Sequence, residues 1–278
     1  MSDLYLKGRT AMVTGGASGM GRAMALAFAK AGADVAIGSL LTTQSQKKED
    51  GELVHMPSTE DLDRTKKEIE SNGVKALAME LDVCDNDSIR AFYDAVIKEF
   101  GQVDILANAA GITVEKTMVG HPDELWNKVI DVNLNGPFRT IKLVLPDMIK
   151  QGWGRIINIA STAASVGAPT SGAYCASKAG VVGLTRCVAL EGAEHGVTAN
   201  TISPGWVESD FGRSWMSHIA ETAEGRSGEE FINDEKSNNP QKRMIQPYEI
   251  GNLAAFLCKE ESMGINGQDM TVSGGSVW

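Results

Sequence analysis

Tyr174 and Lys178 are the two residues whose types and spacing most directly suggest chemistry. They are four positions apart, so on a helix both side chains lie on one face, one turn from each other. An ammonium group beside a phenol stabilises the phenolate and is expected to lower the pKa of the phenol. A tyrosine with a lowered pKa can act as a general acid or base near neutral pH. Taken alone, such a pair is more often solvated on a helix surface, so the rest of the chain has to distinguish the two interpretations.

A serine upstream of this pair extends the candidate site. Ser161 directly follows the apolar run 155–160, which has the pattern of a buried strand. Ligands of open α/β sheets bind at the carboxyl ends of the strands. A hydroxyl group at that place could hold a substrate oxygen while Tyr174 moves the proton.

A glycine-rich turn near the N-terminus predicts a dinucleotide site. A strand is expected over 9–14 and a helix over 22–31, and between them lie Gly15, Ala17, Ser18, Gly19, Met20 and Gly21. The glycines let the backbone approach a pyrophosphate, and the helix N-terminus offers N–H groups and the positive end of its dipole. A strand, a glycine-rich turn and a helix in this order form the usual context of dinucleotide binding.

The end of the second expected strand, 33–38, bears on the choice of cofactor. An acidic residue there would bind the ribose 2′-hydroxyl and select NAD, but this chain has Ser39. Ser39, Thr42 and Thr43 could donate hydrogen bonds to a 2′-phosphate, while Lys47 and Lys48 lie nearby or are simply solvated. We therefore expect NAD(P) as the cofactor, with a preference for NADP.

Two further strand ends are expected to line the cofactor. The third strand, 75–81, leads to Asp82 and Val83, and Asp82 either accepts from the adenine amino group or caps the next turn. The fourth strand, 103–107, is followed by Asn108, Ala109, Ala110 and Gly111. Small side chains at that strand end would let the cofactor lie against it.

The alternation of expected strands and helices predicts the fold. Helices are expected over 59–71, 86–100, 122–150, 172–195 and 247–259, with further strands over 197–203 and 269–273. This order favours one Rossmann-like α/β domain over 1–278, a doubly wound parallel sheet with helices on both faces. Asn133, Gly136 and Pro137 inside the 122–150 helix predict a kink.

Two segments interrupt this alternation. The polar insertion at about 40–58 is longer than most connections, and it is either a flap over the adenosine end of the site or surface decoration without a role. The segment 206–243 is polar but contains several aromatic residues. We expect it to be a mobile lid over the substrate, with a poorly ordered loop as the alternative.

Composition excludes several classes of protein. The 278 residues are 42% hydrophobic and 22% charged, which suits one large α/β domain. No apolar run approaches the ~20 residues of a membrane span, and residues 1–7 lack the apolar core of a signal peptide. A formal net charge of −10 argues against a nucleic-acid surface. The four cysteines are scattered without a paired motif, so we expect reduced thiols, no metal site and a cytoplasmic location.

Taken in order, these motifs resemble those of the classical short-chain dehydrogenase/reductase family, over nearly all of the chain. The run from Thr14 to Gly21 matches the cofactor turn of the family, and 108–111 matches its Asn-Asn-Ala-Gly motif except at Ala109. Pro204 and Gly205 match its Pro-Gly motif, and Ser209 stands where threonine is usual. The family's catalytic tetrad falls in order on Asn133, Ser161, Tyr174 and Lys178.

The resemblance implies hydride transfer between a nicotinamide and a carbon that bears oxygen, without a metal. Tyr174 would give or take the hydroxyl proton, Lys178 would lower the tyrosine pKa and bind the nicotinamide ribose, and Ser161 would hold the substrate oxygen. Asn133 would hold a water that relays protons from Lys178 to solvent. The nicotinamide carboxamide would meet Pro204, Gly205, Val207 and Ser209. The family usually forms dimers or tetramers through its two long helices, here 122–150 and 172–195, so the resemblance also implies a homo-oligomer.

Several functions stay open at this point. The expected one is an NAD(P)-dependent alcohol dehydrogenase or carbonyl reductase for a small-molecule substrate. A 3-oxoacyl thioester reductase is an alternative in the same family, but it needs a basic patch for an acidic carrier, and the bases near 206–243 lie among acids. A cofactor-binding regulatory protein without turnover is disfavoured by the intact tetrad. An epimerase or dehydratase would require a larger substrate domain after Pro204.

Overall fold

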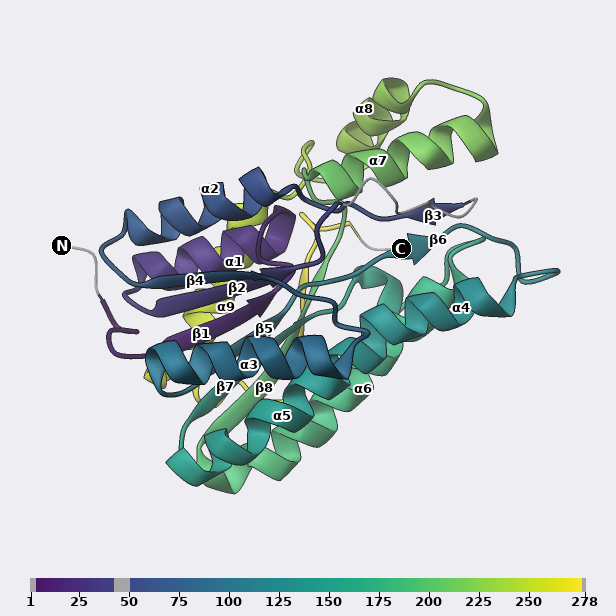
Figure 1. Cartoon of the computed structure of the whole chain (residues 1–278). Helices are drawn as coiled ribbons and strands as arrows, with labels where there is room; N and C mark the ends of the chain where they lie inside the picture. The colour runs from purple at the N-terminus through teal and green to yellow at the C-terminus, as the bar shows by residue number, and fades with distance from the viewer. Residues whose placement is uncertain (1–3, 43–50, 277–278) are drawn as a thin grey trace.

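The computed structural model describes residues 4–42 and 51–276, and in these residues a seven-stranded parallel sheet forms the centre of the fold (Figure 1). Its strand order is β4-β2-β1-β5-β7-β8-β9. The strands are β1 (Thr10–Thr14), β2 (Asp34–Ser39), β4 (Ala76–Glu80), β5 (Ile105–Asn108), β7 (Gly154–Ile159), β8 (Val197–Pro204) and β9 (Asp269–Val272). The strand order reverses between β1 and β5, which is where an open sheet leaves a crevice at its carboxyl edge. The predicted doubly wound, Rossmann-like fold is confirmed.

Helices cover both faces of the sheet (Figure 1). One face carries α1 (Gly19–Lys30), α2 (Thr59–Glu70) and α9 (Pro247–Leu257), and the other carries α3 (Asn86–Phe100), α5 (Gly136–Gln151) and α6 (Gly172–Gly192). None of the helices within the described ranges is long and apolar enough to cross a bilayer. The alternation of strand side chains produces the two cores, because successive residues point to opposite faces. In β1, Val13 packs in the α1 and α9 core, whereas Met12 packs in the α3 and α5 core.

Local signals set several helix boundaries. α3 begins after Asp85, whose side chain accepts from the Asp87 N–H, and ends at Gly101 in the left-handed conformation with φ of 85°. α2 begins at a capping box formed by Ser58 and Asp61. α1 begins at Gly19, three residues earlier than expected, so the last glycines of the turn already belong to the helix.

The expected kink in the 122–150 helix is present as a π-turn. α4 (Asp123–Ile130) passes into a π-helical turn, Asp131–Asn135, before α5 begins. Pro137 at the start of α5 has no N–H to donate to the preceding turn. π-Turns inside helices often mark functional sites. Here the π-turn directs Asn133 inwards, towards the carboxyl edge of the sheet.

The described part of the insertion is anchored to the rest of the chain. β3 (Glu52–Leu53) pairs antiparallel with β6 (Thr113–Val114), and the Glu52 carboxylate lies 2.7 Å from Lys128 Nζ of α4. Thr43, Lys47 and Lys48, which the sequence suggested as phosphate partners, lie outside the described residues. We call residues 51–58 the flap.

The segment 206–243, called the lid from here on, forms two helices. These are α7 (Asp210–Ile219), continued by a π-turn over Ala220–Glu224, and α8 (Gly228–Asn238). They project from the carboxyl edge of the sheet beside the flap (Figure 1). A small apolar core holds them together and includes Met216, Phe231 and Ile232. The alternative of a poorly ordered loop is therefore wrong, because the aromatic and apolar residues of the lid form a core of their own.

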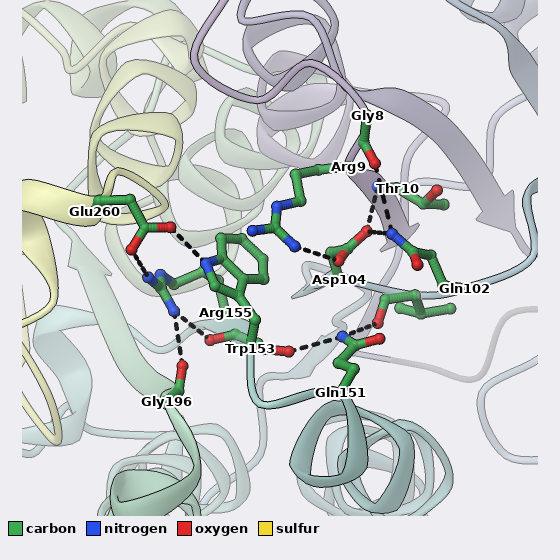
Figure 2. Close-up of polar contacts among 12 residues, drawn as sticks. Gly8, Arg9, Thr10, Gln102, Asp104, Gln151, Trp153, Arg155, Gly196 and Glu260 are labelled. Carbon is green, nitrogen blue, oxygen red and sulfur yellow. Dashed lines mark hydrogen bonds and ion pairs between the residues drawn. The ribbon is translucent and has the colours of Figure 1, made fainter.

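At the opposite, amino edge of the sheet, stacked side chains around Trp153 connect several strands (Figure 2). The indole of Trp153 lies between two guanidinium groups, 3.7 Å from Arg9 Cζ and 4.2 Å from Arg155 Cζ. Glu260 accepts a hydrogen bond of 2.6 Å from the indole N–H and lies 3.6 Å from the Arg155 guanidinium. Arg9 also pairs with Asp104, at 3.1 Å. The cluster joins the starts of β1, β5 and β7 at the edge away from the candidate site.

Candidate active site

The structure brings Ser161, Tyr174 and Lys178 together at the carboxyl end of β7. Tyr174 lies in the first turn of α6, one turn before Lys178, and the two residues are 8% and 5% exposed. Ser161 follows β7 and accepts a hydrogen bond of 3.1 Å from the Ala163 N–H. A hydrogen bond also links the Ser161 and Tyr174 side chains. The two hydroxyl groups can therefore contact one substrate oxygen.

The titration of the Tyr174 phenol differs from the expectation. Burial raises the pKa of Tyr174 to about 12, and the hydrogen bond with Ser161 opposes this shift only partly. Burial also lowers the pKa of Lys178 to about 8. The Lys178 ammonium lies 5.5 Å from the Tyr174 ring and donates to the carbonyl oxygen of Ile159 at 2.8 Å. Loss of hydration therefore dominates the pKa of the Tyr174 phenol in this structure, and the expectation that Lys178 lowers that pKa stays a prediction.

A protonated phenol can act directly as a general acid. With its pKa raised, Tyr174 holds its proton at neutral pH and can donate it to an oxygen that gains negative charge. To act as a base in the reverse direction, the phenol needs further stabilisation of its phenolate. Positive charge next to the phenol, including that of Lys178 moved closer, would supply it.

Asn133 lies near this group and makes three hydrogen bonds. Its amide nitrogen donates to Ile112 O at 2.9 Å and to Ser177 Oγ at 3.1 Å, and its oxygen accepts from the Ile112 N–H at 2.9 Å. A Cβ added at Gly111 would lie 3.4 Å from Asn133 Oδ1 and 3.6 Å from Lys178 Nζ. Asn133 therefore fixes the backbone of 111–112 beside Lys178. Its expected role in holding a water stays a prediction.

The glycine-rich turn has the close contacts that a cofactor turn requires. Gly15 has φ of 67°, and a Cβ there would lie 2.8 Å from the backbone nitrogen of Ala110. A Cβ at Gly21 would lie 2.1 Å from Gly15 O, so neither glycine can be replaced without moving the backbone. The first hydrogen bond of α1 runs from the Arg22 N–H to Ser18 O, at 3.0 Å, and the first turn of α1 carries no acidic residue. The N-terminus of α1 thus suits a pyrophosphate group.

A groove runs along the carboxyl edge of the sheet from β2 to α6. Most of the expected cofactor residues line it, namely Gly15, Ser18, Gly19, Met20, Gly21, Ser39, Asp82, Val83, Ala109, Ala110, Gly111, Tyr174, Lys178 and Ser209. Asp82 also caps the next turn, because its carboxylate accepts from the Cys84 N–H at 2.8 Å. The residues present therefore fit an extended dinucleotide.

Other expected residues lie behind the groove or beside it. The Asn108 side chain is buried and bonds Asn158 and Thr140, each at 2.8 Å, so it holds the end of β5 and does not line the groove. Ala17 is buried, and its N–H donates to Ser39 Oγ at 3.0 Å. Pro204, Gly205 and Val207 line the adjoining cavity described below.

The sequence offered a flap over the adenosine end as one of two interpretations of the 40–58 insertion, but it did not show which residues would contact the groove. Residues 54–57 line the groove opposite the glycine-rich turn. Thr42 Oγ1 donates to Met56 O at 2.6 Å, so the hydroxyl proton of Thr42 holds the flap and is not available to a phosphate. The expectation for Thr42 is therefore wrong. Apart from apolar residues such as Val54 and Met56 in a polar stretch, the sequence held no signal for this contact.

A second cavity of about 390 Å³ opens on the other side of Tyr174. It shares Met20, Tyr174, Ser209 and Phe211 with the groove. Its other walls come from Glu115, from residues within 160–171, from 204–205 and from the lid. The Trp215 indole packs edge to face on the Tyr174 ring, with 4.8 Å between ring centroids. Tyr174 therefore lies where the groove and a largely apolar cavity meet.

Comparison with known proteins agrees with this geometry. The family model described as enoyl-(acyl carrier protein) reductase matches residues 15–276. A 3-oxoacyl-[acyl-carrier-protein] reductase FabG of Staphylococcus aureus is 33% identical over 96% of this chain and 97% of its own length. The FabG of Thermotoga maritima is 34% identical over 99% of this chain and 100% of its own length.

Solved structures of reductases are similar to the whole fold. An actinorhodin polyketide ketoreductase crystallised with NADPH superposes with a TM-score of 0.86 at 34% identity, covering 96% of both chains. A levodione reductase superposes with a TM-score of 0.85 at 27% identity, covering 97% of both chains.

Proposed function

The chain belongs to the classical short-chain dehydrogenase/reductase family of oxidoreductases, and on that premise we propose that it interconverts a small-molecule alcohol with its ketone or aldehyde. One observation carries this proposal. Tyr174 lines both a groove that fits a dinucleotide and a cavity that can hold a carbonyl compound. When bound, the nicotinamide cofactor supplies or accepts the hydride at the reacting carbon.

The residues around Tyr174 have separate tasks in this proposal. Tyr174 donates its proton to the substrate oxygen in reduction and takes it back in oxidation. Ser161, hydrogen bonded to the phenol, holds the same oxygen. Lys178, whose pKa burial lowers to about 8, supplies positive charge beside the groove and can exchange protons near neutral pH. Asn133 positions 111–112 against Lys178.

We also propose a preference for NADP over NAD. Ser39 ends β2 where an acidic residue would repel a 2′-phosphate, and it lines the groove. Its oxygen accepts from the Ala17 N–H, which leaves the hydroxyl proton free to be donated to a ligand. The structurally similar actinorhodin polyketide ketoreductase was crystallised with NADPH, which supports the same preference here.

The flap and the lid complete the site in this proposal. The flap covers the groove at residues 54–57, and the lid covers the adjoining cavity. His55 Nε2 lies 3.9 Å from a carboxylate oxygen of Asp210 at the start of α7, so the two segments meet over the site. We propose that both belong to one catalytic domain over 1–278, the flap as part of the insertion at about 40–58 and the lid as the cover of the substrate.

A homo-oligomer is proposed through the two long helices. Phe138 on α5 and Leu190 on α6 are 48% and 79% exposed, which is high for large apolar side chains on helices that pack against the same face of the sheet.

A 3-oxoacyl thioester reductase is the second candidate. It is favoured by the similarity to the FabG proteins of Staphylococcus aureus and Thermotoga maritima, whose names state that activity. It differs from the first candidate only in the substrate, because both use the same proton transfer by Tyr174.

Fluorescence titration with NADPH and NADH, followed by turnover assays on a panel of ketones, aldehydes and alcohols, tests the proposal. We expect tight binding of NADPH and turnover of at least one carbonyl compound. Binding of neither nucleotide would contradict the assignment of the groove. Binding without turnover of any carbonyl compound or alcohol would favour a regulatory protein.

A further inference from the structure

The cavity beside Tyr174 has the lining of a site for flat, uncharged molecules. Its lid wall includes Trp206, Phe211, Trp215 and Ile219, and its opposite wall includes Val166 and Pro169. Resting on the function proposed above, we propose that the substrate is an uncharged ketone or secondary alcohol with an aromatic or cyclic body, and not an acyl chain presented by an acidic carrier protein.

The lid aromatics form one connected cluster around Trp215. The indole of Trp215 lies 4.8 Å from the Tyr174 ring, 5.3 Å from the Trp206 ring and 5.8 Å from the Phe211 ring, measured between centroids. The interplanar angles of 73°, 79° and 54° are those of edge-to-face and tilted packing. A substrate whose oxygen reaches Tyr174 therefore has its body against Trp215. A planar ring can continue this packing, whereas a hydrated sugar chain would lose hydrogen bonds there.

Glu115 holds Trp215 in place and sets the charge of the cavity. Its carboxylate accepts from the Trp215 indole N–H at 2.7 Å and from the Ser171 hydroxyl at 2.8 Å, and Thr170 donates to the same group. Among the described residues that line the cavity, Glu115 alone carries a charged side chain. A second carboxylate or a phosphate in the same space would meet a like charge in surroundings of low dielectric. The cavity therefore disfavours anionic substrates.

The rim of the lid does not offer the basic surface that an acidic carrier needs. Arg213 pairs with Glu208 and Glu229, and Lys236 lies 3.4 Å from Glu208. Arg226 pairs with Glu224 and Asp234. Arg243 pairs with Glu249, and Lys242 donates to Ser237 O. Each base that the sequence suggested for carrier docking is thus occupied within the chain, and the chain as a whole is acidic, with a net charge of −10. The lid face is expected to repel an acidic protein.

Steady-state kinetics on matched substrates tests the proposal. The intact protein would be assayed with NADPH and three compounds: 2-tetralone, a 2-tetralone that carries a carboxylate on its ring, and an acetoacetyl thioester on a carrier protein. We expect kcat/KM for 2-tetralone to exceed that for each of the other two by at least about tenfold. A thioester that is preferred over 2-tetralone would overturn the proposal.

Two variants test the assigned residues. Glu115→Gln keeps the shape of the side chain and an oxygen for the indole N–H but removes the charge. We expect the preference for 2-tetralone over its carboxylated analogue to fall several-fold. Glu221→Gln makes the same change on the lid outside the cavity and should leave that preference unaltered. Trp215→Ala should raise KM for 2-tetralone at least about tenfold, and an unchanged KM would contradict contact between Trp215 and the substrate.

A binding measurement separates this proposal from the proposed function. Calorimetry would compare 2-tetralone with its carboxylated analogue on the Tyr174→Phe variant saturated with NADPH, where no turnover is needed. Tighter binding of the neutral ketone by at least about tenfold supports the substrate class even if the wild-type protein turns over neither compound. Equal or weaker binding of the neutral ketone overturns the substrate class even if the protein proves to be an active reductase.

Discussion

Lys178 donates a hydrogen bond to the carbonyl oxygen of Ile159, 2.8 Å away, while its ammonium lies 5.5 Å from the ring of Tyr174. The lysine thus connects the end of β7 with the face of α6 that carries Tyr174. Both side chains are almost fully buried, and burial shifts both pKa values against their charged forms. At neutral pH the Tyr174 phenol is therefore protonated, and the Lys178 ammonium loses its proton at a lower pH than an exposed lysine does.

The buried ammonium should cost the protein stability, in a manner that depends on pH. Burial lowers the pKa of Lys178 from 10.5 to about 8, so below pH 8 the penalty is fully present. Between about pH 8 and 10.5 the folded state loses this proton while the unfolded state keeps it, so this contribution to stability rises with pH. We expect Lys178→Met to raise Tm at pH 7 and the gain to shrink towards pH 10.

Thermal unfolding of the wild-type and Lys178→Met proteins at pH 7 and pH 9.5 measures this effect. The raised pKa of Tyr174 lowers stability above pH 10 in both proteins, so it cancels in the difference. Lys150→Met, on the exposed side of α5, is the control and should show no such pH dependence. A Lys178→Met variant that is equally destabilised at both pH values would contradict the argument.

Ser39→Asp should shift the cofactor preference towards NAD. A carboxylate at the end of β2 can still accept from the Ala17 N–H, but it repels a 2′-phosphate and can bind a 2′-hydroxyl. We expect the ratio of the Kd values for NADPH and NADH to rise at least about tenfold. Ser39→Ala, which adds no charge, should change the ratio far less. An unaltered ratio in Ser39→Asp would mean that this position does not face the adenosine ribose.

Glu52→Gln should loosen the flap and speed the release of the cofactor. The Glu52 side chain is 4% exposed and lies 2.7 Å from Lys128, so the ion pair ties β3 to α4. Removal of the charge weakens this anchor. We expect the dissociation rate constant of NADPH, measured by stopped-flow fluorescence, to rise several-fold. Glu70→Gln, which breaks the exposed pair with Lys66, is the matched control, and equal rates in both variants would rule out the anchor.

Glu260→Gln should destabilise the protein without affecting turnover. The glutamine can still accept from the Trp153 N–H, but the buried Arg155 guanidinium loses its counter-charge (Figure 2). A loss of about 1–2 kcal/mol in the free energy of unfolding is expected in urea titrations. Glu261→Gln is the neighbouring control. The cluster lies at the amino edge of the sheet and the candidate active site at the carboxyl edge. A large fall in kcat would therefore contradict the view that the cluster contributes to stability but not to turnover.

The features that could be predicted from the sequence are those that depend only on residues close together in the chain. The turn at Gly15 and Gly21, the helix over 86–100 and the kink around Asn133 each follow from a few adjacent residues, and the structure has all of them. The family resemblance ordered Ser161, Tyr174 and Lys178, and the structure places them together. The hydrogen bonds of the Asn108 side chain could not be predicted, because its buried partners, Asn158 and Thr140, are distant in the chain.

The contacts that hold the flap and the lid in place, and the pKa shift of Tyr174, could not be predicted from the sequence for the same physical reason. The flap depends on the pairing of β3 with β6, and the arrangement of the lid depends on the bond from Trp215 to Glu115, 100 positions apart. The pKa of Tyr174 depends on how completely the lid and the loop after β7 remove water from it. Such contacts become visible only once the chain is folded.

The comparison of wild-type protein with Tyr174→Phe tests the central claim most directly. The variant removes one hydroxyl group and keeps the ring that packs against Trp215. In parallel, NADPH binding would be followed by fluorescence and kcat by turnover of the best ketone substrate. We predict that kcat falls by at least about 10³-fold, within the range of general acid catalysis, while the Kd for NADPH changes less than about threefold. Retained turnover in Tyr174→Phe would contradict proton transfer by Tyr174 and with it the proposed reaction.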